Sequence, residues 1–409
     1  MSMDAFEPKI ALKILSLYAD GRNTTYGYNS YSILIPCKDF QGAPILKYCF
    51  LNASFFRYSA KLSRGVWEVP VDNWVPMDGD TFLTREGFIL NVFGYEHPEG
   101  RVFSFLKYIP SRFKELFSIR FLERTWKYGD TELFRAEKLY TAKNYQNFLE
   151  FFSKNFPDYV YFCPYRRKNV ISAPLPNIKE VFVPRERFQA ILNAEKRDKL
   201  QELTLNFIQL ISSESGVSIE DFGVHGSIAL NMHSEESDID IVVYGRSNFR
   251  KVEAAVERLV RDGVLSYVFN NRLDAARRFK GRYQNKIFMY TAVRKPGEVT
   301  SKYGEYAYAP IAPVQFRCKV KDDGDAIFRP AVYKIENYTP LNHQSELPKS
   351  MVPEAVVSMI GCYRNVARKG DEIRVSGMLE KVEKLQSGEI FYQVVVGTAE
   401  SEEEYIWPI

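Results

Sequence analysis

The chain has 409 residues, a length that predicts two to four domains at ~100–200 residues each. With 45% hydrophobic and 26% charged residues, it has the composition of an ordinary soluble globular protein, and a formal net charge of +4 indicates no particular partner. No apolar run approaches the ~18–20 residues that cross a bilayer, and the first residues lack a signal-peptide pattern. We therefore expect a cytoplasmic protein with no membrane partner.

The cysteines and histidines form no recognisable metal-binding pattern. No cysteine pair has CxxC spacing, which favours free thiols in a reducing compartment over a zinc site or a disulfide framework. The histidines form no HExxH cluster, so a metal site in this chain would have to be built from carboxylates. The residues concerned are Cys37, Cys49, Cys163, Cys318, Cys362, His97, His225, His233 and His343.

The first part of the chain divides into an extension and an α+β domain. Residues 1–78 predict a short helix over 10–18 and strands over 30–35 and 46–51, with no catalytic constellation, so the role of this extension is left open. Residues 79–185 predict a β-hairpin or meander, with strands over 81–93 and 101–108, and then a helix over 145–156. Prolines favour irregular chain from about 164 to 185; they are Pro164, Pro174, Pro176 and Pro184.

The remainder changes from mixed to almost all β. Residues 186–300 predict helices over 185–213 and 248–262 and a strand over 287–293. Residues 301–409 predict short strands over 314–320, 331–335, 372–379 and 390–396, which suggests a small barrel or sandwich. The expected fold class is therefore mixed α+β with a C-terminal all-β domain. That domain is either an OB-like barrel that binds single-stranded nucleic acid or a packing domain that braces the neighbouring domain.

Two aspartates alternate with apolar residues in the segment Asp238-Ile239-Asp240-Ile241-Val242-Val243. Because successive side chains of a strand face opposite ways, Asp238 and Asp240 are expected on one face, near the end of an apolar strand. Two adjacent carboxylates repel each other unless a cation lies between them. Mg²⁺ prefers such oxygen ligands and takes one or two carboxylates together with substrate phosphates.

A glycine-serine pair precedes these aspartates by ten residues. Gly226-Ser227 follows a short apolar strand candidate and precedes a plausible helix start at Ile228. Glycine permits a tight turn and a close backbone approach, serine can cap the helix, and free amides at a helix start favour phosphate. A phosphate cradle beside metal-binding carboxylates is the machinery of nucleotidyl transfer.

This composite resembles the active-site segment of the DNA polymerase beta superfamily of nucleotidyltransferases. More narrowly, the chain is similar to a group of archaeal predicted nucleotidyltransferases, from about residue 79 to the C-terminus. The resemblance rests on the Gly-Ser turn, on Ser237-Asp238-Ile239-Asp240 running into Val242-Val243-Tyr244-Gly245, and on Thr84-Arg85-Glu86-Gly87-Phe88-Ile89. It implies Asp238 and Asp240 as catalytic metal ligands, Gly226 and Ser227 as phosphate-binding residues, and Mg²⁺ or Mn²⁺ as the cofactor.

The pattern departs from that family at one point. The resemblance implies a third carboxylate on a following strand, near Met289, where this sequence has none. Asp274 and Glu336 are the substitutes that the sequence offers. Without this third carboxylate, the sequence fits both an enzyme that transfers a nucleotide and a protein that only binds one.

A basic stretch lies just before that strand. Residues 272–286 carry six cations against one acid, and a stretch of this kind either contacts a triphosphate or nucleic-acid backbone or forms a solvated helix face. The candidate contacts are Arg277, Arg278, Lys280 and Arg282. Tyr283 in this stretch could stack on a base and His225 beside Gly226 could contact phosphate, but structural roles are expected for both.

The sequence thus predicts a Mg²⁺-dependent transfer of a nucleoside monophosphate from an NTP to a hydroxyl of RNA, protein or a small molecule. The alternative is a catalytically impaired nucleotide- or RNA-binding protein that retains the fold. The missing third carboxylate favours the alternative, and the intact pair of Asp238 and Asp240 favours the enzyme.

Overall fold

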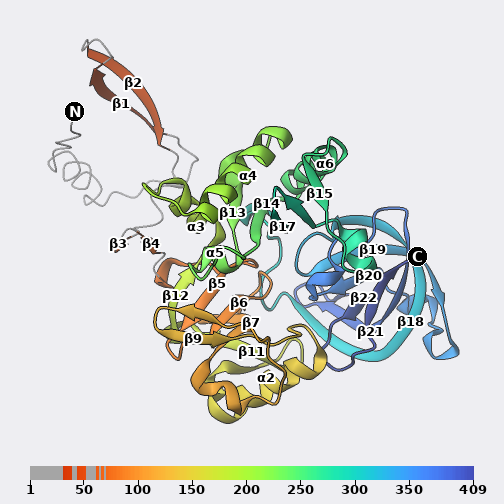
Figure 1. Ribbon diagram of the computed structural model, residues 1–409. Coiled ribbons are helices and arrows are strands. Elements are labelled where there is room, and N and C mark those ends of the chain that lie inside the picture. The colour runs from red at the N-terminus through yellow and green to blue at the C-terminus, as the bar shows by residue number, and fades with distance from the viewer. Residues whose placement is uncertain (1–30, 39–43, 52–60, 64–65, 69–70) are drawn as a thin grey trace, which may run out of the picture. The chain divides into compact units, whose positions relative to one another are not determined.

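The computed structural model describes residues 31–38, 44–51, 61–63, 66–68 and 71–409 (Figure 1). The chain divides into two compact units, Met1–Ser59 and Ala60–Ile409. In the first, β1 (Tyr31–Lys38) and β2 (Pro44–Leu51) form an antiparallel ribbon, which confirms the strands expected there. The helix expected over 10–18 lies outside the described residues. The second unit begins with the short pair β3 (Lys61–Ser63) and β4 (Val66–Glu68).

A first sheet occupies the part of the chain before residue 183. Its strands run in the order β10-β11-β7-β6-β5-β12, and β9 joins β8 to β7. Their bounds are β5 (Thr81–Thr84), β6 (Ile89–Val92), β7 (Arg101–Pro110), β8 (Trp126–Tyr128), β9 (Thr131–Phe134), β10 (Val160–Cys163), β11 (Lys168–Pro174) and β12 (Ile178–Phe182). The meander is confirmed, with one refinement: residues 81–93 form two strands, because a turn at Gly87, whose φ is +91°, divides them. The helix α2 (Ala142–Asn155), also expected, buries Phe148 and Phe152 against this sheet.

The expectation of irregular chain over 164–185 was wrong, because β11 and β12 lie there. The prolines stand at element boundaries, where a missing amide does not interrupt a ladder. Pro174 is the last residue of β11, and Pro184 opens α3 (Pro184–Leu192), a position that suits proline's fixed φ.

The second sheet carries the Asp-Ile-Asp segment. Its order is β13-β14-β17-β16-β15, in which only β14 and β17 are parallel. The strands are β13 (Phe222–Val224), β14 (Ile239–Tyr244), β15 (Leu265–Tyr267), β16 (Lys280–Tyr283) and β17 (Lys286–Val293), and the helices are α3, α4 (Lys199–Ser215), α5 (Gly226–Ala229), α6 (Arg246–Arg261) and α7 (Arg272–Arg277). The helices expected over 185–213 and 248–262 are confirmed, although the first is two helices. The two helices are α3 and α4, and α4 starts at a capping box between Asp198 and Gln201.

The two faces of this sheet have different neighbours. Ile239, Ile241 and Phe288 point into a core shared with Phe207 of α4 and Val252 of α6. The opposite face packs Val242, Tyr244 and Val293 with Tyr95, a residue that follows β6. Because side chains alternate along a strand, Asp240 belongs to this second face, away from the helices.

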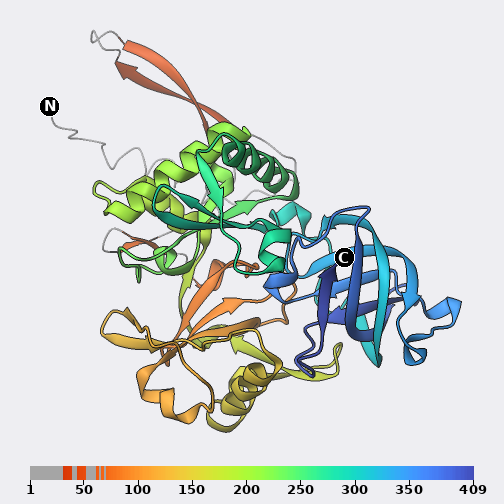
Figure 2. The same cartoon turned by 45° about the vertical axis from the view of Figure 1, so that its right-hand side comes forward.

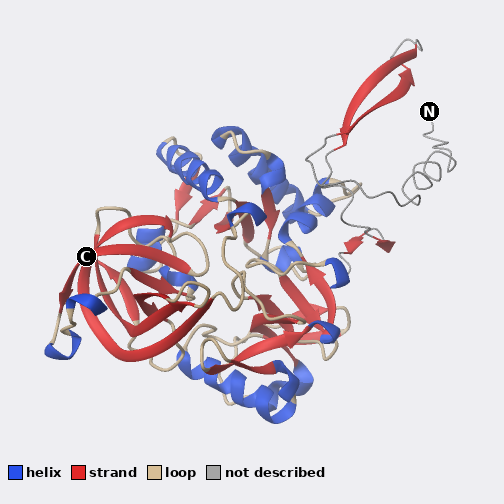
Figure 3. Cartoon of the chain, turned by 180° about the vertical axis from the view of Figure 1, so that it is seen from behind, coloured by secondary structure: helices blue, strands red, loops and turns tan. Residues whose placement is uncertain are grey.

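The C-terminal part is a barrel, which confirms one of the two β architectures expected. Its strands are β18 (Tyr306–Asp325), β19 (Ala331–Pro340), β20 (Ala355–Ser358), β21 (Glu372–Lys384), β22 (Glu389–Val396) and β23 (Tyr405–Pro408). Pairing follows β18-β19-β20-β22-β21 and returns to β18, with β20 and β22 parallel and β23 added to β21. Five strands in this closed circuit have the connectivity of an OB-fold barrel. Figure 2 and Figure 3 show its long curled strands beside the other two sheets.

Among the described residues, no helix has the length and apolar character that crossing a membrane requires.

Candidate functional site

The two aspartates lie at the start of β14. Asp238 immediately precedes the strand and is exposed, whereas Asp240 is its second residue and is half-buried. Strand alternation turns both carboxylates to the face that lies away from the helices. The strand itself is held in the sheet by buried Ile239 and Ile241, so the pair is carried on a rigid element.

The Gly-Ser turn is packed directly against Asp240. Gly226 has φ +65°, and a Cβ added there would stand 2.1 Å from Oδ2 of Asp240, so only glycine fits. The backbone N–H of His225 donates to the carbonyl oxygen of Asp240 at 2.9 Å. The helix α5 begins at Gly226 itself, so Ser227 lies inside its first turn and does not act as the N-cap expected of it.

Electrostatics at the pair favour a cation. Burial raises the pKa of Asp240 to about 6; the nearby charge of Lys107 opposes the rise and that of Asp238 adds to it. In the part of the chain that the structure describes, no three His, Cys, Asp or Glu residues come together as a metal cluster. Two adjacent carboxylates are a donor set that fits a divalent ion whose other ligands are substrate phosphates and water, as Mg²⁺ prefers.

The position of the missing third carboxylate is now defined. In the register of the sheet, Asp240 pairs with Met289 of β17, and Met289 pairs with Lys280 of β16. The row beside Asp240 therefore holds a thioether and then a lysine, and neither is the carboxylate that the resemblance implies. The suggested substitutes lie elsewhere: Asp274 is on α7, and Glu336 is on β19 of the barrel.

The basic stretch separates into two pairs. Lys280 and Arg282 alternate with Gly281 along β16, and their register opposite Met289 and Ile287 puts them on the carboxylate face. The guanidinium of Arg282 is exposed and donates to the carbonyl oxygen of Asn285 at 3.3 Å. These two side chains remain available to a ligand at the carboxylates.

The other two arginines are engaged within the fold. Arg277 is buried, forms an ion pair with Asp274 at 3.8 Å and lies over the ring of Phe279. Arg278 pairs with Glu257 at 3.1 Å. The structure therefore does not assemble the four cations into one track, because the last turn of α7 directs Arg277 inward.

Sequence reasoning missed a lysine that faces Asp240. Lys107 is only 8% exposed and lies on β7 of the first sheet. Burial lowers its pKa to about 8; the charge of Arg135 adds to the fall, and that of Asp240 opposes it. A lone lysine inside the apolar strand Arg101–Pro110 was the available signal.

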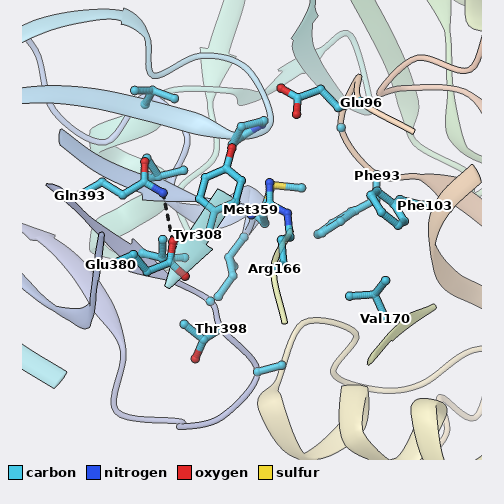
Figure 4. A pocket seen from close by; sticks show the side chains of 18 of the residues that line it. Phe93, Glu96, Phe103, Arg166, Val170, Tyr308, Met359, Glu380, Gln393 and Thr398 are labelled. Atoms are coloured by element: carbon cyan, nitrogen blue, oxygen red, sulfur yellow. Dashed lines mark hydrogen bonds between the residues drawn. The ribbon is translucent and has the colours of Figure 1, made fainter. Parts of the chain in front are cut away.

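A cavity of about 1110 Å³ lies apart from the carboxylates, between the first sheet and the barrel. Phe93 and Phe103 line one side and Tyr308 and Gln393 the other, and Gln393 donates to Glu380 at 3.1 Å (Figure 4). Neither aspartate lines it.

Comparisons with known proteins agree with this geometry. Residues 206–287 match the family model of a nucleotidyltransferase domain, and this segment contains both the Gly-Ser turn and the aspartate pair. An uncharacterised protein of the archaeon Methanocaldococcus jannaschii is 27% identical over 354 residues, which cover 80% of this chain and 97% of that protein. No solved structure matches the chain. The protein therefore carries a nucleotidyltransferase domain and, along most of its length, is similar to an archaeal protein.

Proposed function

We propose that this protein transfers a nucleoside monophosphate from an NTP to a hydroxyl acceptor in a Mg²⁺-dependent reaction. The observation that carries the proposal is the contact between the turn and the strand, where the backbone of Gly226 abuts the carboxylate of Asp240. A phosphate held at the turn would thus stand next to the carboxylates that hold the metal. Nucleotidyl transfer needs this positioning and charge neutralisation more than it needs covalent chemistry.

Each residue has a separate role in this proposal. Asp238 and Asp240 bind Mg²⁺ or Mn²⁺, which when bound neutralises phosphate charge, and Gly226 and Ser227 hold phosphate oxygens through their amides and the serine hydroxyl. Rigid placement by β14 keeps the reacting groups aligned, and such alignment accounts for a large share of catalysis.

The acceptor is a hydroxyl of RNA, protein or a small molecule. Lys280 and Arg282 lie on the carboxylate face and supply positive charge to a phosphate-bearing acceptor or to the NTP. Their alternation along β16 gives two cations on one side, which is enough for local phosphate contacts.

A second candidate is a nucleotide-binding protein without turnover. Met289 favours it, because this side chain stands beside Asp240 where the resemblance implies a carboxylate. Two carboxylates still bind a metal, so NTP binding is expected under both candidates.

One experiment separates the two candidates. Wild type and the Asp238→Asn/Asp240→Asn variant are incubated with each labelled NTP and Mg²⁺ or Mn²⁺, either alone or with total RNA. Label transferred to RNA or to the protein by wild type only would establish the enzyme and its acceptor. NTP binding without transfer to RNA, to the protein or to a panel of small hydroxyl compounds added in parallel would favour the binding protein.

A further inference from the structure

Three buried cations converge beside the Gly-Ser turn from outside the matched nucleotidyltransferase segment. Lys107 on β7 is 8% exposed, Arg329 between β18 and β19 is 9% exposed, and Arg364 after residues Gly361–Tyr363 is 7% exposed. All three belong to the compact unit Ala60–Ile409.

These cations lack partners to match their charge. Arg329 has one carboxylate, Asp78, at 3.5 Å. The guanidinium of Arg364 and the ammonium of Lys107 make no hydrogen bond or ion pair with any described residue, although the ammonium lies 5.5 Å from the ring centroid of its neighbour Tyr108. The Nε atoms of Arg329 and Arg364 are buried without an acceptor. The two arginines thus share one buried carboxylate, Asp78, and Lys107 has the charge of Asp240 nearby without an ion pair to it.

The two guanidiniums also lie close together. A Cβ built on Gly361 would be 3.4 Å from Nη2 of Arg329 and 3.8 Å from Nη2 of Arg364. Burial, together with the charge of Arg329, lowers the pKa of Arg364 to about 10. Like charges held together in a dry environment cost free energy, which an anion bound between them would recover.

The cluster adjoins the candidate site. Burial holds the pKa of His225 well below its usual value, and the charges of Lys107, Arg329 and Arg364 each lower it further, so all three reach this residue electrostatically. His225 directly precedes Gly226, and Lys107 acts on Asp240 as well. The ring of His225 lies against the first sheet, with its Nε2 3.4 Å from Oγ1 of Thr81 on β5. An anion among the three cations would therefore act on the residue that opens the turn.

We propose that Lys107, Arg329 and Arg364 bind the triphosphate of the NTP, supplied by the two regions that flank the nucleotidyltransferase segment. The inference rests on the proposed function and deepens it. Guanidinium groups match phosphate oxygens in charge and in their fork of N–H donors. A triphosphate brings more negative charge than Asp78 and Asp240 supply to the three cations. The flanking regions thus add buried cations to Lys280 and Arg282 of the matched segment.

The test measures binding of inorganic tripolyphosphate and of ATP by calorimetry, with EDTA and separately with Mg²⁺. The variants are Arg364→Met and Lys107→Met, and the matched control is Arg317→Met, which removes an exposed arginine on β18. Each cluster variant is expected to weaken tripolyphosphate binding in EDTA by about 10- to 100-fold, the range for a lost hydrogen bond to a charged group. The control should leave affinity unchanged.

Thermal unfolding provides a second, independent measurement. Without ligand, Arg364→Met should unfold at the same temperature as wild type or higher, because it removes an uncompensated buried charge. Tripolyphosphate should stabilise wild type and not this variant. A purely structural Arg364 would give the reverse, with a lower unfolding temperature and unchanged anion affinity.

The outcomes distinguish this inference from the proposed function. The Asp238→Asn/Asp240→Asn variant should still bind tripolyphosphate without metal. If this variant loses nucleotide transfer but keeps that binding, the loss is due to the carboxylates and leaves the triphosphate site intact. The triphosphate site would be overturned if wild type and both cluster variants bound tripolyphosphate in EDTA with the same affinity. It would also be overturned if wild type bound sulfate as tightly as tripolyphosphate. If Arg364→Met does not fold, Lys107→Met decides the question by the same criteria.

Discussion

Replacing Gly226 with alanine tests the contact on which the proposed site depends. The new methyl group would stand 2.1 Å from Oδ2 and 3.1 Å from Cγ of Asp240, and the backbone there has φ +65°. Two costs therefore arise, one from a left-handed conformation in an L-residue and one from a steric clash. The clash falls on the carboxylate that the proposal assigns to the metal.

The two costs have different sizes and can be separated. A left-handed conformation costs an L-residue roughly 1–2 kcal/mol, and overpacking adds about 1–3 kcal/mol. Gly216 has φ +66° with nothing within 4 Å of its Cβ position, so Gly216→Ala carries the first cost alone. We expect Gly226→Ala to lower the free energy of unfolding by about 1–3 kcal/mol more than Gly216→Ala does.

Urea denaturation of the full chain measures both variants, and Mg²⁺–ATP titration follows the site. Moving Asp240 by an ångström should reduce transfer activity by about 100-fold, whereas Gly216→Ala should leave it intact. In an Asp240→Ala background the nearest remaining atom is Cβ at 3.3 Å, so Gly226→Ala should cost less there. Equal losses from Gly216→Ala and Gly226→Ala, with no coupling to Asp240, would refute the close approach.

Further predictions concern charge at and near the site. The Asp238→Asn/Asp240→Asn variant should keep the fold and weaken Mg²⁺–NTP affinity, and unchanged calorimetric affinity would remove the metal site. If RNA binds, Lys280→Ala/Arg282→Ala should reduce the slope of log affinity against log salt concentration by about 1.4, from about 0.7 per lost phosphate contact. Identical salt dependence in wild type and variant would show that these two residues do not contact RNA. Burial raises the pKa of Asp80 from 3.8 to about 7, so the folded state binds more protons and the free energy of unfolding should fall as pH rises from 4 to 8. Asp80→Asn should make that fall smaller, the remainder coming from Asp240, whose pKa burial also raises. A denaturation series with the full wild-type pH dependence would exclude Asp80 as a source of it.

Local patterns determined much of the fold. The apolar stripe of α6 and the alternation of β14 are short-range periodicities, and short-range sterics and burial decide such elements. The same alternation predicted that Asp238 and Asp240 would share a face. The prolines over 164–185 were wrongly taken as a sign of irregular chain, because the sequence does not distinguish a proline at the end of a strand from a proline in a loop.

Pairing between distant strands could not be read from the sequence. The register that puts Met289 beside Asp240 and Lys280 beside Met289 is a property of the assembled sheet. The burial of Arg277 depends on the direction of the last turn of α7, which its neighbours in a charged run do not reveal. Barrel closure likewise depends on β18 pairing with β21, about 65 residues apart along the chain.

The aspartate pair, Asp238 and Asp240, and the Gly226-Ser227 turn could be recognised in the sequence, because each is made of residues within a few positions of one another. The cations around the pair, in contrast, come together through tertiary packing. Lys107 comes from a strand more than 100 residues earlier, and its charge acts on Asp240 only because the first sheet packs near the second. Electrostatic interactions act through space and are strongest where burial removes water, so their partners are set by packing and not by position along the chain.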